Sequence, residues 1–195
     1  MIQYYDNTPF CILSLDEHNE ILDLQGIHNL IKTIKDDILL LPINDEYKDD
    51  TLTARWKQWN IFLLKQSILH PIYRVITKGV RQYFKELKIT DKNLYINGWA
   101  NLTEKNTQIT GHSHSFPISG YIPISAEPSK TIFKWNNNEY GINNTNGQLV
   151  LSLGNIYHGT SFWKDDDPRT SIAFDVIPGY FVDKHVDGPL IPMYI

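Results

Sequence analysis

The chain has 195 residues, of which 42% are hydrophobic and 21% are charged. These proportions are typical of a soluble folded protein of one domain, and they exclude a disordered chain, a collagen and a coiled coil. With 18 basic and 22 acidic residues the formal net charge is −4, which disfavours nucleic acid as a partner because phosphate binding needs a basic surface.

The single cysteine and the N-terminal sequence both favour a location inside the cell. Cys11 is the only cysteine, so no intramolecular disulfide can form, as is usual in the reducing cytoplasm. The first residues lack the basic start and the apolar run of a signal peptide, and no stretch approaches the roughly 20 apolar residues of a membrane span. We therefore expect a cytoplasmic protein with no membrane partner.

The N-terminal part is predicted to begin with a hairpin, followed by a helix. Two short apolar runs, residues 9–13 and 21–24, flank a turn-like segment. From Ile27 onward apolar residues recur at steps of three and four, which predicts a helix that ends before Pro42. The acidic segment 44–50 is then expected to be a solvated loop.

A second helix is predicted over residues 71–87. Its apolar residues share one face, which suits a helix that covers a sheet, and Pro71 suits the first turn. Trp56 and Trp59 precede this helix, and ordinary packing is favoured over a binding site for both.

After Asp91 the chain changes to short runs rich in β-branched and aromatic residues. These runs predict strands at residues 93–102, 107–114, 118–125, 131–136, 148–153 and 169–177. The many Asn and Gly residues between 135 and 148 predict a loop. Helices followed by strands indicate an α+β chain whose C-terminal half is a sandwich or a barrel.

Three histidines in the strand-rich half are spaced like metal ligands. His112 and His114 form an H-x-H pair, and His158 follows later in the same half. Residues i and i+2 of an extended segment point to the same face, so the pair could present two imidazoles to one ion, with a third from a neighbouring strand. Imidazole suits iron, zinc, copper and nickel, so the pattern leaves the metal open. The alternative is that the histidines are structural.

Arg169 begins the last predicted strand, where alternation places it on one face with Ser171, Ala173 and Asp175. A guanidinium inside a barrel needs an anionic partner, and a small dicarboxylate, with Ser171 as a further donor, is a chemically sound one. The alternative is a structural ion pair of Arg169 with Asp175 or with the loop carboxylates at 165–167.

Taken together, these residues resemble the Fe(II)- and 2-oxoglutarate-dependent oxygenases, and more narrowly a branch of small members with H-x-H, a distal His and R-x-S in that order. The similarity covers about residues 93–178. The segments that carry it are Trp99-Ala100-Asn101, His112-Ser113-His114, Ser119-Gly120-Tyr121, Gly147-Gln148-Leu149-Val150, His158 and Arg169-Thr170-Ser171-Ile172-Ala173-Phe174. The resemblance implies a double-stranded β-helix core, of the jelly-roll or cupin-like type, with N-terminal helices packed on its sheet.

We expect a single domain over residues 1–195. In this division residues 1–90 are a mainly helical support with an N-terminal hairpin, 91–180 are the catalytic double-stranded β-helix and 181–195 are a tail. The end of the tail is apolar enough to dock on the body or on a partner.

The resemblance implies that His112 and His158 bind Fe(II). Most of the family has a carboxylate two residues after the first His, where this chain has His114. A neutral ligand there makes the metal site more positive. A three-His site is favoured because His114 shares a face with His112; the alternative is that a carboxylate from elsewhere, such as the loop 165–167, completes the set.

The resemblance further implies that 2-oxoglutarate is the cosubstrate. Arg169 with Ser171 would hold its distal carboxylate, while its keto-acid end would chelate the metal. Tyr121 and Asn101 lie on neighbouring predicted strands and would reach the cosubstrate, against an equally weighted role in packing or at a strand end.

The expected activity is that of an oxygenase, by default a hydroxylase, which uses dioxygen and 2-oxoglutarate and releases succinate and CO2. Its substrate is left open between a small molecule and a protein side chain. Two alternatives are a 2-oxoglutarate-independent three-His dioxygenase of the cupin type and a non-catalytic jelly-roll binding module. The R-x-S after the distal His favours the 2-oxoglutarate enzyme over the first alternative.

Aromatic residues are the candidates for two further features, a dimer interface and the walls of the pocket. A homodimer is left open, with Tyr73 and Tyr83 as candidate interface residues. The candidate walls of the pocket are Trp99, Trp135, Phe162 and Trp163, each with ordinary packing as the alternative.

Overall fold

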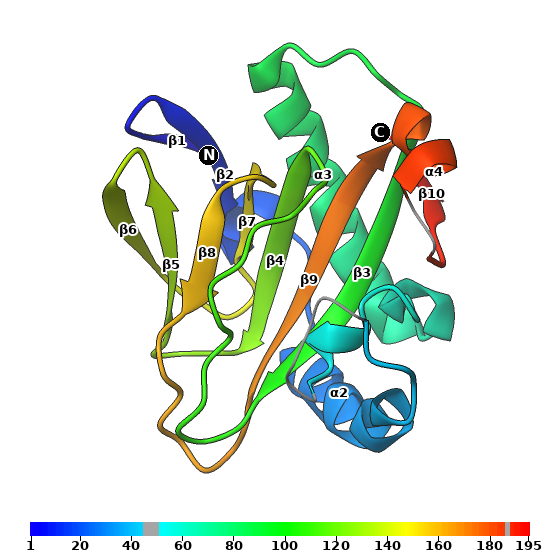
Figure 1. Cartoon of the computed structure of the whole chain (residues 1–195), viewed down its shortest axis with the longest axis vertical. Coiled ribbons are helices and arrows are strands. Elements are labelled where there is room, and N and C mark those ends of the chain that lie inside the picture. Colours follow the sequence, from blue (N-terminus) through cyan, green and yellow to red (C-terminus); the bar gives the residue numbers. More distant parts are fainter. Residues whose placement is uncertain (45–50, 186–187) are drawn as a thin grey trace.

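The computed structural model describes residues 1–44, 51–185 and 188–195. Two antiparallel sheets form its centre (Figure 1). The larger sheet has the strand order β1-β2-β7-β4-β9-β3-β10, and the smaller sheet has the order β6-β5-β8. Of the loop predicted at residues 44–50, all but Asn44 lie outside the described residues.

The strands are short except at the middle of the larger sheet, where β3 and β9 pair over their whole length. In spatial order the larger sheet contains β1 (Ile2–Tyr5), β2 (Thr8–Leu13), β7 (Leu149–Leu153), β4 (Ile118–Ser125), β9 (Arg169–Pro178), β3 (Leu94–Thr103) and β10 (Ile191–Met193). The smaller sheet contains β6 (Asn138–Asn143), β5 (Lys130–Trp135) and β8 (Tyr157–Thr160).

Helices cover the side of the larger sheet that faces away from the smaller sheet (Figure 1). The long helices of this cover are α2 (Leu24–Leu39) and α3 (His70–Leu87). The shorter helices are α1 (Leu15–His18), α4 (Gly179–His185) and the 3₁₀ helices η1 (Thr53–Arg55), η2 (Ile61–Leu64) and η3 (Ser67–Leu69). Of these, η1 and α4 each contribute a residue, Thr53 and Phe181, to the cavities described below. α2 packs on β3 and β4, and α3 packs on β2 and β7. Among the described residues no helix is long and apolar enough to cross a membrane.

Local sequence explains where the two long helices begin and end. The side chain of Asp23 accepts a hydrogen bond from the backbone N–H of Gly26 and so caps α2. Pro71 lies in the first turn of α3, where its missing N–H costs no hydrogen bond, and Lys88 ends that helix in the left-handed conformation. Each helix buries one apolar stripe, as its three-to-four-residue spacing predicts.

Strand β9 has the helices on one side and the smaller sheet on the other, and different types of side chain face the two sides. Thr170 contacts His28 of α2, so the even-numbered residues of β9 face the helices. Arg169, Ser171 and Ala173 line a cavity between the sheets, so the odd-numbered residues face the smaller sheet. Period-two alternation therefore sends apolar residues into the core and polar ones into the interior of the two-sheet body.

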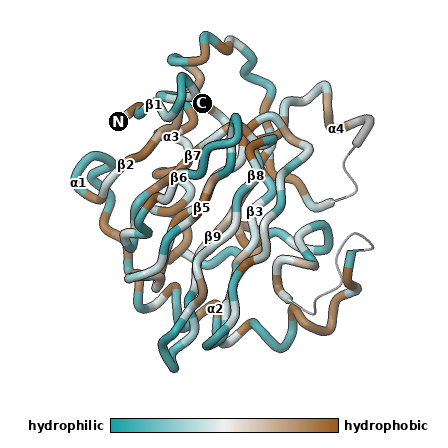
Figure 2. The backbone as a smooth tube through the Cα atoms, turned by 60° about the vertical axis from the view of Figure 1, so that its left-hand side comes forward, coloured by the Kyte–Doolittle hydropathy of each residue, from teal (hydrophilic) through white to brown (hydrophobic). Residues whose placement is uncertain are grey.

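The core between the larger sheet and the helices is apolar and fully buried. In Figure 2 the hydrophobic colour runs through the strands and helices, whereas most connecting loops are hydrophilic. Phe174 belongs to this core and has no exposed surface. In the sheet, Phe174 of β9 pairs with Gly98 of β3 on one side and with Gly120 of β4 on the other. A Cβ on Gly120 would lie 2.6 Å from the Phe174 ring, so the ring occupies the space that this glycine leaves.

Replacing Phe174 with alanine is expected to lower the free energy of unfolding by about 3 to 5 kcal/mol, because a buried ring is lost and a cavity remains between two glycines. Urea unfolding followed by circular dichroism measures this change. The matched control is Phe162→Ala, whose side chain is 58% exposed and whose loss should cost less than about 1 kcal/mol. Equal effects of the two substitutions would contradict this description of the core.

Most predicted elements are confirmed. The helices predicted from Ile27 to Pro42 and over 71–87 correspond to α2 and α3, and the latter covers a sheet as expected. The strands predicted near 93–102, 118–125, 131–136, 148–153 and 169–177 correspond to β3, β4, β5, β7 and β9. The chain therefore combines helices with antiparallel sheets, as the order of its segments indicates.

The predicted N-terminal hairpin is wrong in its second strand. β2 pairs with β1, through a turn at Asp6 and Asn7, and both turn residues have positive φ. The segment 21–24 leads into α2 instead, because Asp23 caps that helix. The hairpin joins the larger sheet through pairing of β2 with β7, so the N-terminal segment contributes to the main sheet as well as to its helical cover.

Two predictions in the C-terminal half also need correction, and three elements there were missed. The segment 135–148 contains strand β6, which pairs with β5 through a turn at Asn136 and Asn137; asparagine tolerates the positive φ required there. The segment 107–114 is not a regular strand and forms one isolated bridge, His112 with His158. β8, α4 and β10 were not predicted, and β10 docks the described part of the tail, 188–195, on β3.

Candidate functional site

The three predicted histidines lie together between the two sheets. The candidate ligand atoms of His112, His114 and His158 all lie within 4.8 Å of one another. Backbone hydrogen bonds hold the residues in place: the N–H of His112 donates to the carbonyl of His158 at 2.9 Å, and the reverse bond measures 2.8 Å. The N–H of His114 donates to the carbonyl of Gly154 at 2.8 Å. The sequence spacing therefore indicated the correct grouping, although 107–114 is irregular.

Each imidazole uses its Nδ1 atom for a partner outside the cluster. Nδ1 of His112 donates to the carbonyl of Thr110 at 2.8 Å, and Nδ1 of His158 donates to the carbonyl of Ile156 at 2.9 Å. Nδ1 of His114 lies 2.7 Å from Oδ1 of Asp175. A carbonyl oxygen can only accept a hydrogen bond, so Nδ1 of His112 and of His158 carries the proton and Nε2 keeps its lone pair, which is the form that ligates a metal ion. The contact of His114 with the Asp175 carboxylate favours a proton on Nδ1 of His114 as well, which leaves its Nε2 as the candidate ligand atom.

Electrostatics favour the neutral form at two of the three rings. Burial, together with the neighbouring imidazoles, lowers the pKa of His158 to about 3. Burial and the nearby His114 also lower the pKa of His112. Burial opposes protonation of His114 as well, but the Asp175 carboxylate outweighs it and raises the pKa of His114. Asp175 thus places one negative charge beside a cluster of otherwise neutral rings.

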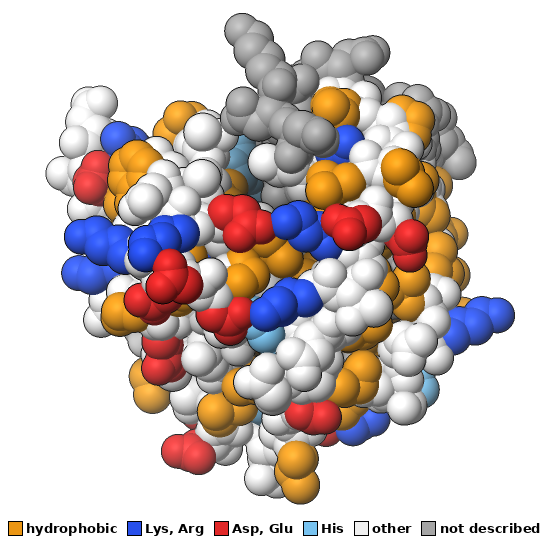
Figure 3. All heavy atoms as spheres, turned by 90° about the horizontal axis from the view of Figure 1, so that it is seen from below, with side chains coloured by type: hydrophobic (Ala, Val, Ile, Leu, Met, Phe, Trp, Pro, Cys, Tyr) orange, Lys and Arg blue, Asp and Glu red, His pale blue; other side chains and the backbone are white. Residues whose placement is uncertain are grey.

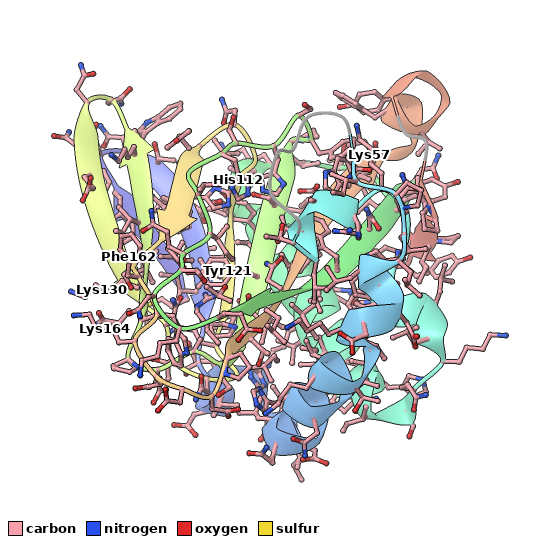
Figure 4. All side chains as sticks on the ribbon, turned by 60° about the horizontal axis from the view of Figure 1, so that its bottom comes forward. Lys57, His112, Tyr121, Lys130, Phe162 and Lys164 are labelled. Atoms are coloured by element: carbon pink, nitrogen blue, oxygen red, sulfur yellow. The ribbon has the colours of Figure 1, made fainter. Side chains whose placement is uncertain are left out.

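One cavity contains all seven residues predicted for the site. It encloses about 530 Å³, counting the part that opens to solvent. The predicted residues that line it are Asn101, His112, His114, Tyr121, His158, Arg169 and Ser171. Figure 4 shows His112 and Tyr121 in the interior between the sheets.

Arg169 is a buried cation in this cavity. Its side chain is 1% exposed, its Nε donates to Oγ of Ser129 at 3.1 Å, and its Nη1 donates to Oγ of Ser171 at 3.3 Å. No carboxylate of the side chains that the structure describes forms an ion pair with it. Burial lowers the pKa of Arg169 to about 10, against the effect of nearby Tyr121. A guanidinium with unused donors and no counter-charge is suited to an anionic ligand.

No ion pair joins Arg169 to Asp175 or to the loop carboxylates at 165–167, so the structural ion pair considered for it is wrong. Oδ1 of Asp166 accepts from Lys105 at 2.7 Å, and Oδ1 of Asp167 accepts from Lys32 at 2.7 Å. Figure 3 shows acidic and basic side chains interspersed on the face seen from below. The loop carboxylates are therefore engaged at the surface and do not complete the histidine cluster either.

Tyr121 carries a buried hydroxyl that has no hydrogen-bond partner among the described residues. Burial raises its pKa, so the hydroxyl keeps its proton and remains a donor. Tyr121 and Arg169 line the same cavity, and an unpartnered donor beside a buried guanidinium is the pattern expected where an oxyanion binds.

Asn101 and its neighbour on β3, Asn97, hold the chain segment that closes the cavity. The hydroxyl of Thr53 donates to Oδ1 of Asn101, and Nδ2 of Asn97 donates to the carbonyl of Trp56 at 2.9 Å. Thr53 lines the cavity, so this segment forms one of its walls. Asn101 has its carbonyl oxygen engaged there, which leaves its amide as the group it can offer to a ligand.

The aromatic walls differ in part from the prediction. Trp99 lines the cavity, as does the unpredicted Phe133, whereas Trp135, Phe162 and Trp163 are not among its lining residues. Phe162 lies at the outer edge of the molecule near Lys130 and Lys164 (Figure 4). Trp163 is buried elsewhere, with its indole N–H donating to the carbonyl of Asp167 at 2.7 Å.

Sequence reasoning also missed three polar residues. Ser129 contacts Arg169 from just before β5, Thr131 lines the cavity, and Asp175 contacts His114. Alternation along β9 placed Asp175 on the cavity side, but nothing in the sequence pairs it with His114, which is 61 positions earlier.

A second cavity adjoins the histidine cluster. It encloses about 930 Å³, again counting open solvent, and it shares Trp99, His112 and His114 with the first. Its additional walls are mixed, since Trp56, Phe116 and Phe181 stand beside Lys57, Asp175 and two serines. The Trp56 ring lies 5.8 Å from that of Trp99 and 6.0 Å from that of Phe116. The cluster therefore stands between two cavities, and the second of them has both aromatic and charged walls.

Comparison with known proteins gives similarity at the level of fold. No protein-family model and no curated protein sequence matches the chain. Among solved structures, a Pseudomonas putida prolyl-4-hydroxylase matches 88% of this chain and 89% of its own, with a TM-score of 0.54 and 8% identity. The nickel complex of the non-heme monooxygenase ThoJ matches 91% and 76%, with a TM-score of 0.55 and 10% identity.

Two further structures belong to enzymes described with iron and 2-oxoglutarate. The epimerase SnoN in complex with Fe3+, alpha ketoglutarate and nogalamycin RO matches 87% of this chain and 78% of its own, with a TM-score of 0.53 and 9% identity. The chain spans only 61% of a 2OG-Fe(II) oxygenase family oxidoreductase from Burkholderia pseudomallei, with a TM-score of 0.45 and 12% identity. At these identities the similarity concerns the fold alone.

Proposed function

We propose that this protein is an Fe(II)- and 2-oxoglutarate-dependent oxygenase, with hydroxylation of a small molecule or a protein side chain as its reaction. The observation that carries the proposal is the coexistence, in one cavity, of three imidazoles with free Nε2 atoms and a buried guanidinium without a carboxylate. We assign the two facing sheets to a double-stranded β-helix, an assignment that the fold similarity supports.

The donor set fits a divalent metal ion. His112, His114 and His158 would hold it through Nε2, since each Nδ1 is engaged by a carbonyl or a carboxylate. Imidazole alone accepts iron, zinc, copper or nickel, and iron is preferred here because the cavity offers a place for a dicarboxylate beside the metal. Bound iron with 2-oxoglutarate supplies the activation of dioxygen, with succinate and CO2 as coproducts.

The other end of the cavity fits the distal carboxylate of 2-oxoglutarate. Arg169 would bind it with Ser171 as a second donor, in a space where a buried ion pair gains from exclusion of water. The hydroxyl of Tyr121 would donate to the same ligand, and Asn101 would offer its amide from β3. The substrate would then approach from the second cavity, which shares His112 and His114 with the first.

Replacing Tyr121 with phenylalanine is expected to weaken 2-oxoglutarate binding about 10- to 100-fold, because a hydrogen bond to a charged ligand is lost. The free energy of unfolding without ligand should not fall, since the hydroxyl has no partner to lose. The matched control is Tyr83→Phe: this buried hydroxyl donates to the carbonyl of Pro9 at 2.7 Å, away from the cavity. It should cost about 1 kcal/mol of stability and leave binding unchanged.

Oxygen uptake with and without 2-oxoglutarate tests the proposed activity. The proposal expects iron-dependent oxygen uptake that requires 2-oxoglutarate and yields succinate in equal amount, even at the slow rate expected without substrate. Oxygen uptake that proceeds with an added chelating substrate and without 2-oxoglutarate would favour the cupin-type dioxygenase. Absence of metal binding would favour the non-catalytic binding module. Cytoplasmic location and a homodimer are further parts of the proposal, to be tested by fractionation and by sedimentation.

A further inference from the structure

The carboxylate nearest the histidine cluster is not part of it. Asp175 lies on β9 with 1% of its surface exposed, and its Oδ1 is 2.7 Å from Nδ1 of His114. The cluster of mutually close ligand atoms consists of the three histidines without Asp175. Asp175 therefore acts on the cluster through the ring of His114.

The surroundings of Asp175 leave His114 as its charged partner. The residues that pair with it across the sheet are Asn97 on β3 and Ser119 on β4, both neutral and buried. The amide of Asn97 is already engaged by the carbonyl of Trp56. Lys57 lines the second cavity together with Asp175, but no ion pair of Asp175 with a Lys or Arg is found among the side chains that the structure describes.

The charge of the site explains what such a carboxylate can do. Three neutral imidazoles bring no negative charge to a divalent ion, so the positive charge of the metal would be uncompensated inside a buried cavity. A carboxylate bonded to Nδ1–H fixes the orientation of the ring and raises the basicity of its Nε2. The other two rings have only backbone carbonyls at Nδ1, so His114 is the one ligand of the three with an anionic partner.

We propose that Asp175 is a positioning residue that supplies the metal centre, through His114, with the negative charge that its three ligands lack. This inference rests on the proposed function, because it assumes that the cluster holds a divalent metal ion. It assigns to Asp175 an effect on metal affinity and on the ligand field that acts through His114, and no direct contact with the metal.

Metal titration of the folded protein in a two-residue cycle tests the proposal. Co(II) is the probe, because its visible spectrum reports both occupancy and ligand field. Asp175→Asn keeps an acceptor for Nδ1–H but removes the charge, and it is expected to weaken Co(II) binding about 10- to 100-fold and to shift the visible band. The matched control is Asp167→Asn, which removes a carboxylate 3.1 Å from Nε2 of His28, far from the cluster, and should leave Co(II) binding unchanged.

The second arm of the cycle separates charge from structure. His114→Asp places a carboxylate at the ligand position, so in that background the further change Asp175→Asn is expected to cause no loss of Co(II) affinity, and relief of repulsion between carboxylates would raise it. An equal loss in both backgrounds would overturn the proposal in favour of a structural role, and so would unchanged binding by Asp175→Asn alone. If the wild-type protein binds no Co(II) and no Fe(II), the proposed function fails, and this inference fails with it.

Discussion

Replacement of His158 with alanine is expected to abolish metal binding at micromolar concentrations. One of three ligands is lost, so the affinity should fall by more than the roughly 10- to 100-fold that loss of a supporting residue costs. His158 is also the residue whose backbone pairs with that of His112, but those bonds involve main-chain atoms and survive the substitution. Calorimetric titration with Fe(II) under argon, or with Co(II) in air, measures the change.

The control for this substitution is His18→Gln. His18 is likewise almost fully buried, at 3% exposure, but its Nε2 contacts the carbonyl of Gly147 and it is not in the histidine cluster. Its substitution should lower stability and leave the metal affinity of the folded protein unchanged. If His158→Ala binds metal within threefold of the wild type, the three-His site is the wrong interpretation of the cluster.

Replacement of Arg169 with methionine should strongly weaken 2-oxoglutarate binding while sparing the fold. Loss of one partner of a buried charged pair costs about 2 to 5 kcal/mol, which is about a 30-fold to several-thousand-fold weaker affinity. Without ligand the guanidinium is buried and has only the Ser129 and Ser171 hydroxyls as partners, so an apolar side chain of similar length should not lower the free energy of unfolding. Binding is measured on Ni(II)-loaded protein, which does not turn over.

Two further variants sharpen the interpretation. Arg169→Lys keeps the charge but not the planar fork, and we expect an intermediate affinity for 2-oxoglutarate. Arg74→Met removes an exposed arginine whose two contacts with Glu20 measure 2.9 and 2.8 Å, and it should leave 2-oxoglutarate affinity unchanged and stability within about 1 kcal/mol. Unchanged 2-oxoglutarate binding by Arg169→Met would remove the basis for assigning this cosubstrate.

The predictable parts of the fold are those in which a local pattern decides the structure. The stripe that begins at Ile27 and the face that follows Pro71 each specify a helix, because a three-to-four-residue period can bury an apolar side in no other way. β6 was missed because its asparagine-rich sequence has the composition of a loop. It forms because Asn136 and Asn137 adopt the tight turn that returns the chain to β5.

The candidate site likewise has features that local spacing predicts and contacts that only the folded chain shows. The i, i+2 spacing of His112 and His114 predicts a shared direction without knowledge of the fold, and alternation from Arg169 predicts which residues of β9 face inward. The partners of the loop carboxylates could not be predicted, because Lys32 and Lys105 approach them only in the folded chain. For the same reason the unpaired state of Arg169 and the contact of Asp175 with His114 are known only from the structure.

The central claim is that one cavity binds iron at three histidines and 2-oxoglutarate between that iron and Arg169. Anaerobic titration of the protein with Fe(II) and then with 2-oxoglutarate tests it most directly, because a chelated iron–keto-acid complex absorbs weakly in the visible range. We expect a band that saturates at one equivalent of iron, is absent from His158→Ala, and requires far more 2-oxoglutarate in Arg169→Met. Stoichiometric iron binding without any band at saturating 2-oxoglutarate would contradict the claim.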